Sequence, residues 1–236
     1  MNYKYFEAGN YEDFACGRVI VHRAGFPNFP ARLAGEVFMQ CLELTGKDRV
    51  VLYDPCCGGA YVLTVLGFLC GGRIEAIYAS DISPGAIALA QSNLGLLTPR
   101  GLEARKTQLA AMHEKFGKQS HLDATESAAR LEGMLRPIPC TVFQADMMNE
   151  SALAKANFKA DIVFADVPYG NLAHWSEGTP NALDRLLRAS IPVLADGAVI
   201  ALCSDKSQKI QGDQFKRVRK ILVGKRKIEL LQRVAL

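Results

Sequence analysis

The chain has 236 residues, of which 49% are hydrophobic and 22% are charged, and its formal net charge is +4. This length and composition suit a single α/β domain with a sizeable core, while the net charge is too small to identify a partner by itself. No stretch approaches the roughly 20 consecutive apolar residues that a membrane span needs, and the opening segment MNYKYFEAGNYEDF is too polar for a secretory signal. We therefore expect a cytoplasmic protein that does not enter a membrane.

Short apolar runs alternate with helical patterns along the chain, which is typical of parallel strands joined by crossover helices. The amino-terminal part predicts a strand near residues 16–25 and a helix at 31–44. Five further strands are predicted at residues 49–54, 74–81, 140–146, 160–166 and 197–205. Helices are expected at 62–69 and 84–97, and the end of the chain, 226–236, predicts two edge strands or a strand and a helix. We expect residues 1–236 to form one α/β domain with an amino-terminal extension at 1–30.

The segment from about residue 98 to residue 137 is too long for an ordinary loop in a compact domain. It contains two helical patterns separated by the sequence GKQS, so we predict an inserted helical hairpin. Such a hairpin either extends the core or recognises a large substrate. For the second role the segment offers Arg100, Arg105, Lys106, Lys115 and Lys118.

Seven cysteines lie scattered along the chain, mostly within apolar runs, and this arrangement favours buried, reduced thiols. Neither the cysteines nor the four histidines have the spacing of zinc ligands. We therefore expect no metal site.

Acidic residues mark the end of each of the five predicted strands. They are Asp54, Asp81, Asp146, Asp166 and Asp205. A single strand-ending aspartate is usually a turn former or a helix cap. Because the carboxyl ends of parallel strands share one edge, where open α/β sheets bind ligands, the joint placement of these acids predicts a binding site.

The turn after the first of these strands, DPCCGGA, lacks the G-x-G-x-x-G spacing of a dinucleotide-binding turn. An acid before small residues suits a cation such as the ammonium group of a methionine moiety, approached closely by the backbone. Asp81 can accept both hydroxyls of a ribose, and Asp146 can accept from an adenine amino group. Cation, diol and amine together describe S-adenosylmethionine, and we expect its contacts from Asp54, Cys56, Gly58, Gly59, Asp81, Ile82, Asp146 and Met147.

The fourth of these strands ends in ADVPYGN, a segment that suits methylation of an amine on a flat base. Asp166 and the carbonyl of Val167 can hold N–H groups, and Tyr169 can stack on the base. Pro168 restricts Val167 to extended geometry. We predict Asp166, Pro168 and Tyr169 as the catalytic residues; the alternative is a turn stiffened by Pro168, with Tyr169 as packing.

Positive charge concentrates towards the carboxyl end, where Lys206 to Lys227 contains nine Lys or Arg residues and one acid. This run is either a solvated surface or a patch that faces phosphates. Two residues in the polar loop after the acceptor motif, His174 and Trp175, can stack on an extruded base. The predicted RNA contacts are Trp175, His174, Lys216, Arg217, Arg219, Lys220, Lys225, Arg226 and Lys227.

Both motifs resemble those of the Rossmann-like class I S-adenosylmethionine methyltransferases, with DPCCGGA as the first motif and DVPY as the amino-methylating motif. Residues 54–69, 79–105, 115–120 and 166–175 together resemble the avilamycin-resistance rRNA guanine methyltransferase family. This resemblance implies a doubly wound, mostly parallel sheet, methylation of a guanine in large-subunit ribosomal RNA, and antibiotic resistance. It also implies cofactor roles for Asp54, Gly58, Asp81 and Asp146, and acceptor roles for Asp166, Pro168 and Tyr169.

Two departures from the broad class leave the methylated nitrogen open: Ala60 stands where glycine is common, and Val167 replaces the first proline of D-P-P-Y. Pro55-Cys56 superficially fits the nucleophile of pyrimidine-C5 methyltransferases, but its place on the cofactor turn favours packing. Two other functions are compatible with the sequence. One is N-methylation of DNA adenine or another amine, and the other is a catalytically silent RNA-binding module. We expect a monomer whose partner is ribosomal RNA or the large ribosomal subunit.

Overall fold

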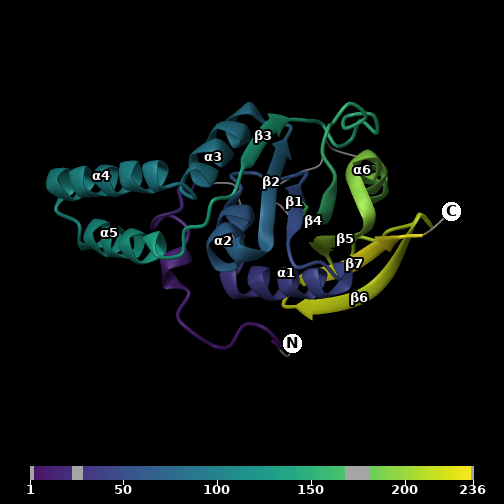
Figure 1. Ribbon diagram of the computed structural model, residues 1–236, viewed down its shortest axis with the longest axis horizontal. Coiled ribbons are helices and arrows are strands. Elements are labelled where there is room, and N and C mark those ends of the chain that lie inside the picture. Colours follow the sequence, from purple (N-terminus) through teal and green to yellow (C-terminus); the bar gives the residue numbers. More distant parts are fainter. Residues whose placement is uncertain (1–2, 23–28, 168–180, 235–236) are drawn as a thin grey trace.

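The computed structural model describes residues 3–22, 29–167 and 181–234. These residues form a seven-stranded sheet with the order β3-β2-β1-β4-β5-β7-β6 (Figure 1). Strands β3, β2, β1, β4 and β5 run parallel to one another. Strand β7 pairs antiparallel with β5, and the edge strand β6 pairs antiparallel with β7. The predicted mostly parallel α/β sheet is therefore confirmed. Its strands are β1 Val50–Asp54, β2 Ile74–Asp81, β3 Cys140–Gln144, β4 Ala160–Asp166, β5 Leu194–Asp205, β6 Phe215–Val223 and β7 Arg226–Arg233.

Helices cover both faces of the sheet. Successive residues of a strand point to opposite sides, and in the central strands both sets are apolar, so each face must be buried by helices. Leu52 and Ile162 pack into a core with α1, α2 and α3, whereas Tyr53 and Val163 pack into a second core with α6. The helix bounds are α1 Ala31–Thr45, α2 Tyr61–Cys70, α3 Pro84–Gly95 and α6 Ala182–Ser190. No helix in the described ranges is both long and apolar enough to cross a membrane. Within the described ranges, which include all seven cysteines, no disulfide joins them.

The predicted helical hairpin is present as α4 (Pro99–Phe116) and α5 (Gln119–Glu132), and it extends well beyond the sheet at the left of Figure 1. Thr98 caps α4 by accepting a hydrogen bond from the N–H of Gly101 at 3.1 Å. Gly117 reverses the chain between the helices with a φ of 63°, a left-handed conformation that favours glycine. Leu102 and Leu131 are buried near the base of the hairpin.

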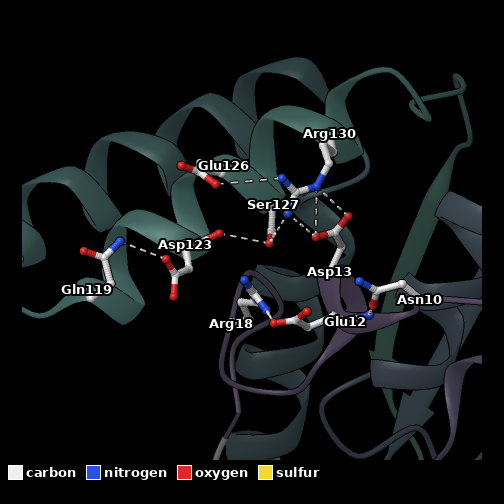
Figure 2. A network of polar contacts seen from close by, with 9 residues as sticks. All are labelled: Asn10, Glu12, Asp13, Arg18, Gln119, Asp123, Glu126, Ser127 and Arg130. Atoms are coloured by element: carbon white, nitrogen blue, oxygen red, sulfur yellow. Dashed lines mark hydrogen bonds and ion pairs between the residues drawn. The ribbon is translucent and has the colours of Figure 1, made fainter.

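A polar network fastens the base of the hairpin to the amino-terminal segment (Figure 2). Arg130 donates from Nη2 and Nε to the Asp13 carboxylate at 2.7 and 3.0 Å. Arg105 of α4 donates to the carbonyls of Arg18 and Val19 at 3.1 and 2.9 Å. Arg105 is one of the cations offered for the substrate-binding alternative, and in the structure it holds the amino-terminal segment against the hairpin.

The predicted strand near residues 16–25 is wrong for its described part, residues 16–22, which form turns and bends. Val19 and Ile20 are fully buried there, as the apolar pattern indicated. Side chains rather than a neighbouring strand satisfy this backbone: Asn93 accepts from the N–H of Val21 at 2.8 Å and donates to its carbonyl at 3.0 Å. The rest of the predicted strand, 23–25, lies outside the described residues.

The carboxyl end forms an edge hairpin, but its two strands are not both drawn from residues 226–236. Strand β7 lies within that range, whereas its partner β6 comes from the basic segment upstream, which the sequence analysis did not assign to a strand. Charged side chains on an edge strand oppose pairing with other chains. In β6 they also obscure the alternation by which a strand is predicted.

Candidate functional site

Four of the five predicted acids lie together at the carboxyl edge of the parallel strands. Asp54, Asp81 and Asp166 are the last residues of β1, β2 and β4, and Asp146 follows the end of β3. Negative charge from Asp54, Asp81 and Asp146 acts on the partly buried thiol of Cys56. The fifth acid differs. Asp205 ends β5, and its carboxylate accepts from both the N–H and the hydroxyl of Ser207 at 2.9 and 2.7 Å, whereas the described bonds of Asp54, Asp81 and Asp146 come from backbone N–H groups alone.

The turn between β1 and α2 is built from small residues for reasons of backbone geometry. Gly58 has a φ of 51° and Ala60 a φ of 54°, so two residues of the turn are left-handed. A Cβ atom on Gly59 would lie 2.6 Å from Cδ2 of Leu89 on α3. Asn93 of α3 also donates to the carbonyl of Gly59 at 2.8 Å. Helix α3 therefore packs directly on this turn and fixes its path.

Backbone N–H groups orient Asp81 and Asp146. Asp81 accepts from Gly58 at 2.9 Å with one carboxylate oxygen and from Ser83 at 2.9 Å with the other. Asp146 accepts from the N–H of Met148 at 2.9 Å. These bonds link the turn after β1 to the end of β2, as a continuous ligand-binding edge requires.

The two apolar residues expected to contact the cofactor have opposite environments. Ile82 is 60% exposed next to Asp81, so its side chain is available to the flat face of a ligand. Met147 is 3% exposed and lies 3.7 Å from the hydroxyl of Tyr53, within the core beneath α6. Its side chain faces the core, which leaves its backbone for contact with a ligand.

Asp54 is a buried carboxyl surrounded by other acids. It is 3% exposed, and the described residues provide no Lys or Arg in an ion pair with it. Burial raises the pKa of Asp54 well above its usual value, the N–H of Cys56 at 2.9 Å opposes this effect, and the charges of Asp166 and Asp81 raise the pKa further. A cation placed beside Asp54 would reverse this balance.

Cys56 and Cys57 are suited to packing rather than to nucleophilic attack. Burial raises the pKa of the Cys56 thiol, and the neighbouring carboxylates raise it further, so the thiol stays protonated. Burial likewise raises the pKa of Cys57. A nucleophilic cysteine needs the opposite environment, because the thiolate is the reactive form.

Asp166 is the acid whose hydrogen bonding is incomplete. Its Oδ1 atom is buried and has no hydrogen-bond partner among the described residues. Burial raises the pKa of Asp166 to about 7, against the lowering effect of Arg226. The next residue, Val167, is 1% exposed and donates to the carbonyl of Cys203 at 3.0 Å. An orphaned buried carboxyl of this kind needs a donor from outside the described residues. Four other predicted residues lie outside them, namely Pro168, Tyr169, His174 and Trp175.

The predicted RNA-contacting cations divide into two groups on the β6–β7 hairpin. Three of them make ion pairs within the protein: Arg217 and Lys227 lie 2.8 and 2.9 Å from Glu229, and Arg219 lies 3.6 Å from Glu43. Arg226 stacks over the Phe29 ring at 5.3 Å. The other group is exposed and has no ion pair within the described ranges; it consists of Lys216, Lys220 and Lys225.

Two kinds of residue escaped the sequence analysis. Asn93 joins α3 to the turn after β1 through its side chain, and nothing in a helical pattern distinguishes it from a surface amide. Lys206 and Lys209 were noted only as part of the basic run, yet they line a cavity together with Arg217 and Lys220. The excess of cations between residues 206 and 227 was the available signal.

Comparison with known proteins gives one consistent result. The family model of the rRNA methyltransferase AviRa matches residues 1–226. A 23S rRNA (guanine(2535)-N(1))-methyltransferase from Streptomyces viridochromogenes is 39% identical over 228 residues, which cover 93% of this chain and 91% of that one.

Solved structures agree with this assignment. The chain superposes on a solved structure of the rRNA methyltransferase aviRa from Streptomyces viridochromogenes with a TM-score of 0.85 and 37% identity, covering 95% of this chain and 93% of that one. A putative methyltransferase, yhhF from Escherichia coli, has a TM-score of 0.52 and 18% identity over 89% of this chain and 90% of its own. The second match shows a shared fold alone.

Proposed function

The chain belongs to the AviRa rRNA methyltransferase family, and from this premise we propose that it transfers a methyl group from S-adenosylmethionine to N1 of a guanine in 23S rRNA. The choice of rRNA guanine N1 follows the name of the relative that is 39% identical. The observation that carries the proposal is the buried Oδ1 of Asp166 at the end of β4, which has no hydrogen-bond partner within residues 3–22, 29–167 and 181–234.

The buried acids at the carboxyl edge fit the cofactor. S-adenosylmethionine supplies a methyl group bonded to a positively charged sulfur, which makes that carbon strongly electrophilic. Asp54 would hold the ammonium group of its methionine moiety, because a buried carboxyl among acids is stabilised by a cation. Asp81 would accept the ribose hydroxyls, Asp146 would accept the adenine amino group, and the exposed Ile82 would cover the adenine face. The turn residues Cys56, Gly58 and Gly59 and the backbone of Met147 would complete the contacts.

A target at N1 changes what the acceptor site must do. An exocyclic amine, the acceptor that the DVPY segment suits, can lose its proton after transfer. The lone pair of guanine N1 is instead delocalised into the ring carbonyl, and N1 carries a proton at neutral pH. A group that removes this proton makes the nitrogen nucleophilic as the methyl group arrives.

Asp166 is suited to take the N1 proton. A pKa of about 7 makes its carboxylate a stronger base than an ordinary aspartate, while leaving much of it ionised at neutral pH. Oδ1 has no partner among the described residues that would compete for the donor. The N1–H would donate to Oδ1, and the proton would move to the carboxylate as the N–C bond forms. Pro168 and Tyr169 would direct the Val167 carbonyl and stack on the base, and His174 and Trp175 would hold the extruded nucleotide.

A labelled-donor assay tests the proposed reaction. The protein is incubated with S-adenosylmethionine carrying a labelled methyl group and, separately, with intact large ribosomal subunits, bare 23S rRNA or duplex DNA. Mass spectrometry of nucleosides then identifies the product, which we expect to be 1-methylguanosine from an RNA substrate. Label on DNA alone, or on a small amine, would replace this proposal with the corresponding methyltransferase. Cofactor binding without transfer to any substrate would indicate a silent RNA-binding protein.

Two consequences belong to the same proposal. Because ribosomes assemble in the cytoplasm, we place the protein there. We also infer that methylation protects the ribosome from an antibiotic that binds near the modified guanine. Expressing the protein in a susceptible bacterium should raise the inhibitory concentration of such a drug, and a catalytically dead variant expressed at the same level should not.

A further inference from the structure

A cavity separate from the rim of acids lies on the β6–β7 hairpin. It has a volume of about 420 Å³ and is bounded by the loop after β5 and by both strands of the hairpin. Five cations and a single carboxylate line it: Lys206, Lys209, Arg217, Lys220, Lys227 and Glu229. Figure 1 shows this hairpin at the opposite end of the molecule from α4 and α5.

The floor of the cavity is a buried ion cluster. Glu229 and Lys227 have side chains that are 5% and 8% exposed and lie 2.9 Å apart, and Arg217 lies 2.8 Å from the same carboxylate. Burial alone would raise the pKa of Glu229, but the hydrogen bond from Arg217 and the positive charges of Lys227 and Arg217 lower it below its usual value. Glu229 therefore stays ionised and fixes both cations, while the cluster as a whole keeps a positive charge.

The walls of the cavity add three exposed cations, of which Lys206 also acts electrostatically on the neighbouring carboxylate of Asp205. Lys206, Lys209 and Lys220 are exposed, and none of them has an ion pair in the part of the chain that the structure describes. Lys206 and Lys209 come from the loop after β5, and Lys220 comes from β6. Like charges converging on one hollow repel each other, so the arrangement favours an anion between them.

Asp184 of α6 holds the loop wall in place. Its carboxylate is 4% exposed and accepts from the N–H groups of Gln211 and Gly212 at 3.1 and 2.8 Å. A loop fixed in this way presents its lysines at a defined position rather than as a mobile fringe. The cavity is also wider than one phosphate needs, and Ile210, Phe215 and Leu231 give it an apolar side that suits a ribose.

We propose that this cavity binds a segment of the RNA sugar–phosphate backbone while the target guanine occupies the catalytic site. The inference rests on the proposed function and deepens it, because it assigns substrate affinity to a site away from the reacting atoms. Lysines aimed at phosphates provide affinity and register without reading sequence.

Paired variants test the cavity. Lys209→Ala combined with Lys220→Ala removes one cation from each wall, and Arg136→Ala combined with Lys155→Ala removes two exposed cations elsewhere as a charge-matched control. RNA affinity is measured at a series of salt concentrations, together with kcat and KM for methyl transfer, cofactor affinity and thermal denaturation. We expect the cavity variant to raise KM roughly tenfold and to reduce the slope of log affinity against log salt by about 1.4 to 1.8. Its kcat, cofactor affinity and melting temperature should match those of the control.

The outcomes separate this inference from the reaction itself. If the wild type methylates RNA and the cavity variant keeps the wild-type KM and salt slope, the cavity has no role and the methyltransferase assignment stands. If the wild type transfers no methyl group to RNA, the binding curves still decide: a weaker, less salt-dependent cavity variant supports the site, and unchanged curves overturn it. An equal loss in the control variant would also overturn it, because general charge would then explain the effect.

Discussion

Backbone N–H groups separate the strand-ending carboxylates into two kinds. Asp81 accepts one hydrogen bond on each of its oxygens, whereas Asp54 accepts one and Asp166 Oδ1 accepts none from the described residues. Ionised carboxylates are stabilised by such donors and penalised by burial. The pKa values of Asp54 and Asp166 are accordingly raised. These two side chains are the ones that a bound ligand changes most.

Asp166 makes stability depend on pH in a definite direction. Its pKa is about 7 in the folded protein against 3.8 in the reference state, so the folded protein favours the protonated form. The stabilisation of the folded protein that results from this preference is complete below pH 4 and is lost as pH rises to about 7. Asp166→Asn removes the charge at little cost in shape. The free energy of unfolding of the variant minus that of the wild type should therefore be larger at pH 8 than at pH 5, by roughly 2 to 4 kcal/mol. Urea unfolding at the two pH values measures this; equal differences at both would contradict the assigned burial.

The same substitution tests the proposed proton transfer. If Asp166 accepts the N1 proton, kcat of the wild type should increase with pH until about pH 7, and Asp166→Asn should lower it by a factor of about 100 or more. Cofactor affinity should change little, which excludes a general loss of the site. A variant that retains wild-type turnover would remove Asp166 from the mechanism.

Asp54→Asn should act in opposite directions on stability and on binding. In the free protein it replaces a buried carboxyl among acids by a neutral amide, so thermal stability at pH 8 should stay the same or increase. Calorimetry should nevertheless show S-adenosylmethionine affinity falling by about 10- to 100-fold, because the ammonium group loses its charged partner. Weaker binding together with lower stability would indicate that Asp54 is structural instead.

At the scale of elements, the turn after β1 depends on the helix that packs against it. The closest contact is between Gly59 and Leu89, and Asn93 adds a hydrogen bond to the carbonyl of Gly59. We predict that the backbone at Gly58 and Gly59 approaches a ligand closely. The structure adds two further reasons for glycine here: Gly58 has a left-handed φ, and Leu89 packs against Gly59. The turn and α3 should respond to substitution as one unit.

Gly59→Ala should force Leu89 away from the turn. A Cβ atom would lie 2.6 Å from Cδ2 and 2.9 Å from Cγ of Leu89, so the side chain must move. We expect a loss of about 1 to 2 kcal/mol in the free energy of unfolding and weaker cofactor binding. Gly72→Ala is the matched control, since nothing lies within 4 Å of its Cβ position. Equal stability of the two variants would show that α3 is free to shift.

Particular elements explain how much could be predicted. Strands β1, β2 and β4 are short apolar runs that end in an acid, so their positions and the placement of these acids at one edge of the sheet followed from the sequence. The amino-terminal segment failed because Val19 and Ile20 are buried without a strand partner, a tertiary effect that periodicity does not reveal. Strand β6 was missed because its cations hide the alternation. Partners such as Glu229 for Arg217 depend on strand pairing, which only the structure provides.

At the scale of the whole molecule, the helical hairpin and the basic β6–β7 hairpin lie towards opposite edges of one sheet. The hairpin is inserted before the edge strand β3, and the cationic cavity lies on β6 and β7 at the opposite edge (Figure 1). Of the hairpin cations, Arg105 and Lys106 are engaged within the protein, Lys106 with Glu103 at 2.7 Å. At the tip, Lys115 and Lys118 are exposed beside Phe116, which is 55% exposed. The tip is therefore the part of the hairpin that can reach a large substrate.

Separate contacts at the two ends should contribute independently to RNA affinity. Lys115→Ala, Phe116→Ala and Lys118→Ala together remove two exposed cations and an exposed ring from the tip. If the tip contacts phosphates and bases, this triple variant should raise KM for RNA roughly tenfold with cofactor affinity unchanged. Joined to the cavity variant, it should raise KM by about 100-fold, because effects at distant sites without shared partners add in free energy. A combined KM no higher than that of either variant alone would mean that the RNA engages one end at a time. An additive result would require one RNA to span the molecule from the hairpin to β6, with the guanine delivered to the acids between them.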